Sequence, residues 1–206
     1  MTMTNRRQPI RSRAGIALVP AVLLAALTGC GPAVPSPENI GERTAAAIRD
    51  AGSVEFTMTN GDLEQTGTVM YEDDEIVALD VTIRDNAERS VEREWVVDGE
   101  YWHARNEHAD PARSGAVPPD ELLAAWDWAQ VQEDMTADAS SIEEVGERTI
   151  DGVDTTGFEI TSDDRVETWW VDESDHLVEY ESELEDGTTG TGTLFAYGET
   201  TEIEVE

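Results

Sequence analysis

The sequence predicts an α+β domain in which an antiparallel β-sheet of about ten strands packs on one face against two or three helices. Three observations lead to this fold class. Most of the chain after residue 52 alternates apolar and polar residues, and Gly- and Asp-rich turns separate the alternating stretches; two other segments repeat apolar residues at helical spacing. Because short connections join antiparallel neighbours, the strands should follow one another as a meander.

The first 29 residues have the pattern of a secretory signal. Residues 6–13 are basic, and residues 14–29 form an uncharged, mostly apolar run. A membrane-spanning helix needs about 20 such residues, and this run is shorter and contains Pro20. The run ends at Cys30, which is the only cysteine of the chain.

The segment Leu27-Thr28-Gly29-Cys30 resembles the bacterial lipobox. The resemblance implies cleavage before Cys30 and attachment of acyl chains such as palmitate to it, at the extracytoplasmic face of the cell membrane. Two or three chains, at about 0.8 kcal/mol per buried CH₂, give lasting anchorage. We therefore expect a lipoprotein signal peptide over residues 1–29, and the alternative is an ordinary signal peptide with a coincidental cysteine. Residues 30–37 would be the lipidated cysteine and a Pro-rich tether, and residues 38–206 a single domain.

Two helices are expected. The first starts at Ser36-Pro37, a typical N-cap followed by a proline, and ends at Gly52. The second spans Asp120–Val131, after a loop over residues 106–119. The expected strands occupy residues 54–59, 69–71, 77–84, 91–97, 101–105, 145–150, 153–161, 165–171, 177–185, 191–197 and 202–205.

The charge of the chain excludes some partners. The 13 basic residues are all Arg, against 46 acidic residues. Four Arg and no acidic residue precede Cys30, so nine positive and 46 negative charges follow, a net charge of -37. Such a domain repels phosphate backbones, so we expect no nucleic acid as a partner. A single cysteine excludes an internal disulfide and a zinc site with several thiolates. We expect a monomer.

No motif indicates catalysis. The three histidines match no known motif of a catalytic nucleophile or a metal site. With 46 acidic residues, close carboxylate pairs arise by composition alone, so they do not indicate a glycosidase. The acidic clusters at 72–75 and 172–175 lack the spacing of an EF-hand loop, so we interpret them as solvated turns, with loose binding of divalent cations as the alternative. We therefore expect no enzyme activity, no catalytic residue, no metal site and no cofactor.

The tryptophans leave two interpretations open. They lie at positions that either fill the core between sheet and helices or line an apolar cavity for an acyl chain. Strand parity and the apolar helix face then select the candidate lining of the cavity: Phe56, Met58, Val77, Leu79, Trp95, Leu122 and Trp126.

Five segments together resemble the actinobacterial lipid-binding lipoproteins of the LppX, LprG, LprA and LprF kind, which share the half-barrel fold of the carrier LolA. They are GSVEF at 52–56, VDGEYW at 97–102, DGVDTT at 151–156, WVD at 170–172 and FAYGE at 195–199. The resemblance implies a curved half-barrel sheet with helices on its concave face, and a lipid or lipoglycan as the ligand of a non-enzymatic protein. The chain departs from the pattern at Thr200, where a proline is usual, in its bulky second helix and in its acidity.

The resulting expectation is a membrane-anchored lipoprotein that binds or carries a lipid or another amphipathic ligand in an apolar cavity. The first alternative is a cell-surface interaction module with a filled core and an acidic binding face. The second is a weak esterase or glycosidase, which would need a Ser-His or carboxylate pair in a cleft.

Overall fold

The computed structural model describes residues 37–205 apart from 107–108, 116–117 and 185–186. The predicted signal peptide, Cys30 and residues 30–36 of the tether lie outside the described residues. The elements are α1 Ile40–Ala51, β1 Ser53–Asn60, β2 Leu63–Glu72, β3 Glu75–Asp85, β4 Ser90–Val97, β5 Glu100–Ala104, β6 Ala112–Gly115, α2 Asp120–Trp126, α3 Trp128–Ala137, β7 Ser141–Ile150, β8 Val153–Thr161, β9 Arg165–Asp172, β10 Leu177–Leu184 and β11 Thr189–Phe195.

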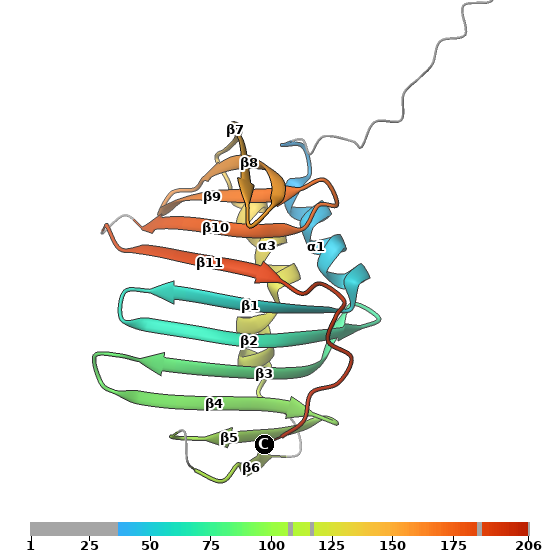
Figure 1. Ribbon diagram of the computed structural model, residues 1–206, viewed down its shortest axis with the longest axis vertical. Helices are drawn as coiled ribbons and strands as arrows, with labels where there is room; N and C mark the ends of the chain where they lie inside the picture. The colour runs from blue at the N-terminus through green and yellow to red at the C-terminus, as the bar shows by residue number, and fades with distance from the viewer. Residues whose placement is uncertain (1–36, 107–108, 116–117, 185–186, 206) are drawn as a thin grey trace, which may run out of the picture. The chain divides into compact units, whose positions relative to one another are not determined.

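The strands of the described part form one antiparallel sheet with the order β6-β5-β4-β3-β2-β1-β11-β10-β9-β8-β7 (Figure 1). It consists of two meanders that are joined where the first strand pairs with the last, with Phe56 opposite Leu194. The predicted fold class, an open curved antiparallel sheet with helices, is confirmed. The described residues contain eleven strands: the expected loop 106–119 contains β6, which pairs with β5, and the expected strand 202–205 is absent.

The topology determines where the helices lie. The chain leaves the sheet at one edge, β6, and must return at the opposite edge, β7. Helices α2 and α3 make this connection across one face of the sheet, here called the helix face (Figure 1). Helix α1 packs on α3, where Gly41 lies so close to Gln132 and Thr136 that no side chain fits between them. Arg49 of α1 also donates two hydrogen bonds to Glu133 of α3, at 2.6 and 3.2 Å.

The two faces of the sheet carry separate apolar clusters. The larger cluster lies between the sheet and the helices and includes Leu79 and Val96. The smaller one contains Trp95 and Ile203. Because successive side chains of a strand alternate between the faces, Trp95 and Val96 point to opposite sides, and Trp95 belongs to the outer face. The C-terminal segment runs along this outer face in Figure 1.

Glycines make room for aromatic rings on the helix face. Phe56 lies opposite Gly67, and Tyr180 lies opposite Gly192. A Cβ atom on Gly67 would come within 2.9 Å of the Phe56 ring, and one on Gly192 within 2.2 Å of the Tyr180 ring. Each ring therefore lies flat across the neighbouring strand, in the space that the absent side chain leaves.

Three predicted elements are corrected. The first helix begins at Ile40, with Asn39 at the N-cap position, and Pro37 lies before it and not at its first helical position. The expected single helix 120–131 is two helices, because Asp127 leaves the helical conformation and its carboxylate accepts a hydrogen bond from the backbone N–H of Gln130, at 3.1 Å, as the N-cap of α3. The expected strand 202–205 is not a strand. Its apolar and polar residues alternate for another reason: Ile203 and Val205 pack against the outer face, while Glu202 and Glu204 are exposed.

Candidate ligand cavity

A cavity of about 380 Å³ lies between helices α2 and α3 and the helix face of the sheet. The strands that contribute to it are β1 and β2 from one meander and β9, β10 and β11 from the other. Its position follows from the topology, because the joined first and last strands place the two meanders side by side under the crossing helices.

One part of the wall is aromatic. Trp126 and Trp128 follow each other around the break between α2 and α3 and both line the cavity. Phe56 supports them from the sheet, with ring centroids 5.4 Å from Trp126 and 5.2 Å from Trp128. Tyr180 approaches Trp128 from β10, with centroids 6.1 Å apart. The further apolar lining comes from Met58, Ala125, Val131, Met135, Trp169, Leu177 and Leu184.

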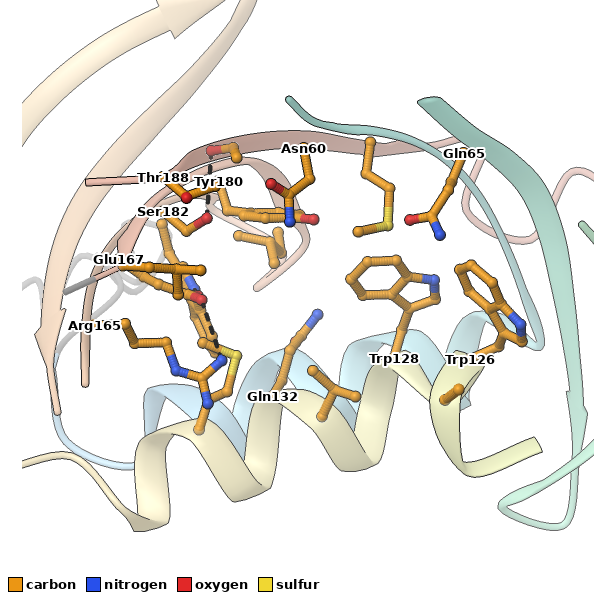
Figure 2. Close-up of a pocket in the computed structure, with 18 residues that line it drawn as sticks. Asn60, Gln65, Trp126, Trp128, Gln132, Arg165, Glu167, Tyr180, Ser182 and Thr188 are labelled. Carbon is orange, nitrogen blue, oxygen red and sulfur yellow. Dashed lines mark hydrogen bonds and ion pairs between the residues drawn. The ribbon is translucent and has the colours of Figure 1, made fainter. Parts of the chain in front are cut away.

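Another part of the lining, here called the polar wall, consists of polar side chains (Figure 2). Glu167 of β9 is 6% exposed, and its Oε2 accepts a hydrogen bond of 2.8 Å from Trp169 Nε1. The nearest cation is Arg165, whose Nη1 lies 3.8 Å from Glu167 Oε1. Burial raises the pKa of Glu167 above its usual range, and the Trp169 hydrogen bond and Arg165 oppose this effect only in part.

Gln132 is the most unusual polar residue of the wall. It is 1% exposed, and neither its Nε2 nor its Oε1 has a hydrogen-bond partner among the described residues. Figure 2 shows its side chain rising from α3 into the cavity. The indole N–H of Trp128, one turn earlier on the same helix, is also buried without a partner. An unpartnered buried polar group costs about 1–3 kcal/mol, so this wall has hydrogen-bonding capacity that the described chain does not use.

The phenol of Tyr180 adds to the polar lining. Burial raises its pKa well above the usual value, and the nearby Glu167 carboxylate raises it further. Tyr180 therefore stays protonated at any physiological pH. Asn60, Gln65, Ser182 and Thr188 complete the polar lining.

The structure brings some of the expected cavity residues together. Met58 and Trp126 line the cavity, and Phe56 packs directly behind it on Trp126. Leu79 and Leu122 belong to the apolar cluster under the helices but do not border the cavity.

The other two expected residues lie elsewhere. Val77 is 39% exposed, because a bulge in β3 shifts the register between Ala78 and Ile76 and leaves Val77 as the extra residue. Trp95 is fully buried on the outer face, where Arg93 stacks over its ring at 4.6 Å. Parity along the strands therefore did not separate the two faces correctly at these two positions.

The polar wall is absent from the lining that strand parity and the apolar helix face predict, although the sequence carries a signal for both Gln132 and Glu167. Gln132 follows Ala129 by three residues and Trp128 by four, so a slightly longer helix would have placed it on the buried face. Glu167 is in phase with Trp169 and Val171 along one strand, so it shares their buried face.

Other polar groups of the described part do not form a reactive site at this cavity. His103 and Ser114 contact each other across β5 and β6, but neither lines the cavity and Ser114 is exposed. His176 pairs with Asp172 at 3.2 Å and stacks on Tyr197. Within the described residues no three His, Cys, Asp or Glu side chains are grouped to hold a metal ion, and no described helix is long and apolar enough to cross a membrane.

Comparison with known proteins gives a fold but no family. No family model matches the sequence, and no curated protein sequence matches it. LprF from Mycobacterium bovis has a similar solved structure, with a TM-score of 0.60 at 16% identity over 83% of this chain and 98% of LprF. The Mycobacterium tuberculosis lipoprotein LppX gives a TM-score of 0.58 at 16% identity over 82% of this chain and 100% of LppX. The chain therefore has the LppX and LprF fold that the sequence motifs predicted.

Proposed function

We propose that this protein is an extracytoplasmic lipoprotein that is anchored to the cell membrane through Cys30 and binds a lipid or another amphipathic ligand in the cavity under α2 and α3. The observation that carries the proposal is the cavity itself, which is lined by the rings of Trp126 and Trp128 and by polar side chains that include Gln132 and Glu167. A compact core would bury neither Gln132 nor Glu167 there without a full set of partners.

The aromatic wall supplies the affinity for an alkyl chain. Each methylene group that leaves water gains about 0.8 kcal/mol, whereas association costs at least about 4 kcal/mol. A chain of medium length therefore binds, provided that the cavity does not have to open first. The stacking of Trp126 and Trp128 on Phe56 keeps this wall in place without a ligand.

Membrane anchorage rests on the N-terminal sequence. Cys30 follows an uncharged apolar run that itself follows a basic segment, as in the precursors of bacterial lipoproteins. LppX, which shares the fold, is named a lipoprotein. Because the proposed anchor precedes the domain, the domain can hold its ligand while the protein stays bound to the membrane. In this proposal the protein is a monomer and catalyses no reaction on the ligand.

Native mass spectrometry tests ligand binding. The chain from residue 30, carrying Cys30→Ser so that no anchor interferes, is purified from a bacterial host, and we expect a mass above that of the polypeptide alone. A clean polypeptide mass, together with no binding of an added fluorescent fatty-chain probe, would reject the proposal.

A matched pair of variants locates the site. Val131→Trp places a large ring in the cavity and should abolish probe binding. Val166→Trp makes the same change at an exposed position of β9, between Arg165 and Glu167 and thus on the outer face, and should leave binding unchanged. If both variants bound the probe equally well, the ligand would not bind in this cavity.

A further inference from the structure

The volume of the cavity limits what it can hold. Pockets for drug-sized ligands measure about 300–1,000 Å³, and this cavity, at about 380 Å³, lies near the lower end of that range. It therefore has room for one alkyl chain with a small head group, and a lipid with several chains would have to leave most of them outside.

The polar wall limits the head group. Gln132 presents one amide donor group and one acceptor, both buried and both without a partner among the described residues. A ligand group that can donate and accept at once, such as a hydroxyl or an amide, satisfies both. An alkane satisfies neither, and an ionised carboxylate can only accept.

The charged groups of the cavity lining disfavour an anionic head group, and a quaternary ammonium group can neither donate a hydrogen bond to Gln132 nor accept one from it. Glu167 is the buried charge of the wall. The one cation of the lining, Arg165, already lies within 4 Å of two carboxylates, Asp164 at 3.6 Å and Glu167 at 3.8 Å. An anion in the cavity would lie near Arg165, whose charge Asp164 and Glu167 already neutralise in part. It would lose its hydration without gaining a free counter-charge.

We propose that the cavity selects a single-chain amphiphile with an uncharged head group that carries hydroxyl or amide functions, and that Gln132 is the residue that recognises this group. The proposal rests on the ligand binding proposed above and specifies its chemistry. The aromatic wall of Trp126 and Trp128 takes the chain, and the amide of Gln132 takes the head group.

Three probes with the same chain and different head groups test the selection: monodecanoylglycerol, decanoate and decyltrimethylammonium, each below its critical micelle concentration. Dissociation constants for the chain from residue 30 with Cys30→Ser are measured by isothermal titration, after cooperative unfolding in urea has shown that it is folded. We expect monodecanoylglycerol to bind at least about tenfold more tightly than either ion. Equal binding of all three probes overturns the selection but leaves amphiphile binding standing, whereas no binding of any probe overturns both proposals.

The role of Gln132 is tested by Gln132→Met, which keeps the length of the side chain and removes its polar atoms. Loss of two hydrogen bonds should weaken binding of monodecanoylglycerol roughly thirtyfold and change decanoate binding little. The ligand-free variant should unfold at a higher urea concentration, because two unpartnered buried groups have gone; a merely structural glutamine would give the opposite shift. The control is Gln130→Met, two residues away on α3, where the side chain is exposed and donates a hydrogen bond to Asp134. This variant should neither weaken the binding of monodecanoylglycerol nor raise the urea concentration of unfolding.

A measurement on the unmodified side chain covers the case in which Gln132→Met does not fold. The side-chain amide resonances of Gln132, in protein with nitrogen-labelled glutamine, should shift when monodecanoylglycerol is added and stay in place with decanoate. Unchanged resonances with the neutral probe at saturation would overturn the assignment of Gln132, as would wild-type affinity in Gln132→Met.

Discussion

Trp128→Ala should lengthen the alkyl chain that the cavity accepts. Trp128 lines the cavity, and its ring is held between Phe56 and Tyr180. Replacing the indole by a methyl group extends the cavity toward the strands that carry these two rings. Because the remaining rings are anchored in the sheet, they cannot close the whole space.

The cost in stability can be estimated from the burial of Trp128. A buried indole removes roughly 150–250 Å² from water, which corresponds to about 4–6 kcal/mol at 25 cal/mol per Å². The change also removes two aromatic contacts, each worth about 0.5–1.5 kcal/mol. Against these losses, the buried Nε1 has no partner, so its removal returns about 1–3 kcal/mol. We expect a net loss of about 5 kcal/mol in the free energy of unfolding, at the upper end of the range for Trp→Ala changes in cores.

Urea denaturation measures the stability, and titration with neutral amphiphiles of increasing chain length measures the cavity. The matched control is Trp95→Ala. Trp95 is also buried, and its Nε1 has no partner among the described residues, but it lies on the outer face. Both variants should lose similar stability, and only Trp128→Ala should shift the preferred chain length upward.

Two results would refute this reasoning. If Trp95→Ala shifted the preferred chain length as much as Trp128→Ala, the ligand would not lie under the helices. If Trp128→Ala lost stability and still bound the same chain with the same affinity, its ring would be part of a filled core and not of a ligand wall.

Three further changes address the helix packing, the buried carboxylate and the anchor. Gly41→Ala puts a Cβ against Thr136 Oγ1 at far less than contact distance, so it should lower the free energy of unfolding by about 1–3 kcal/mol despite the better helix propensity of alanine; an unchanged free energy of unfolding would contradict the close packing. Glu167→Gln should raise stability at neutral pH. Burial raises the pKa of Glu167 in the folded state, so its contribution favours folding below the ordinary glutamate pKa and is lost as pH rises through the folded pKa. The higher stability of Glu167→Gln should therefore disappear at acidic pH. A variant that is less stable than the wild type at neutral pH would contradict this prediction. Cys30→Ser should release the protein from the membrane fraction without changing its unfolding, and continued membrane association would reject anchorage at this residue.

Most of the fold could be predicted because its signals are local. Gly52 ends α1 in the left-handed conformation with N–H bonds to Ile48 and Arg49, as a C-cap glycine does. The turn at Asp98-Gly99 joins β4 and β5 as the sequence predicted. Turns and caps depend on a few neighbouring residues, so one sequence is enough to recognise them.

Long-range pairing could not be derived in the same way. Nothing local indicates that β1 pairs with β11, yet this pairing brings the polar residues of β9 and β10 next to Met58 in one cavity. The bulge at Val77 also depends on the partner strand, and a shift of one residue exchanges the faces of everything that follows it. Parity alone therefore wrongly placed Val77 and Trp95 under the helices.

Residues that fill a core and residues that line an apolar cavity are of the same types, so apolar side chains could not locate the ligand site in the sequence. Polar residues in phase with buried ones are more informative. Glu167 shares a strand face with Trp169, and Gln132 shares a helix face with Ala129. A fully packed core would make both costly, since one is a buried charge and the other a buried amide without partners. Both border the same cavity, so the positions at which the sequence breaks the apolar pattern of its buried faces are the ones that indicate where the proposed ligand site lies.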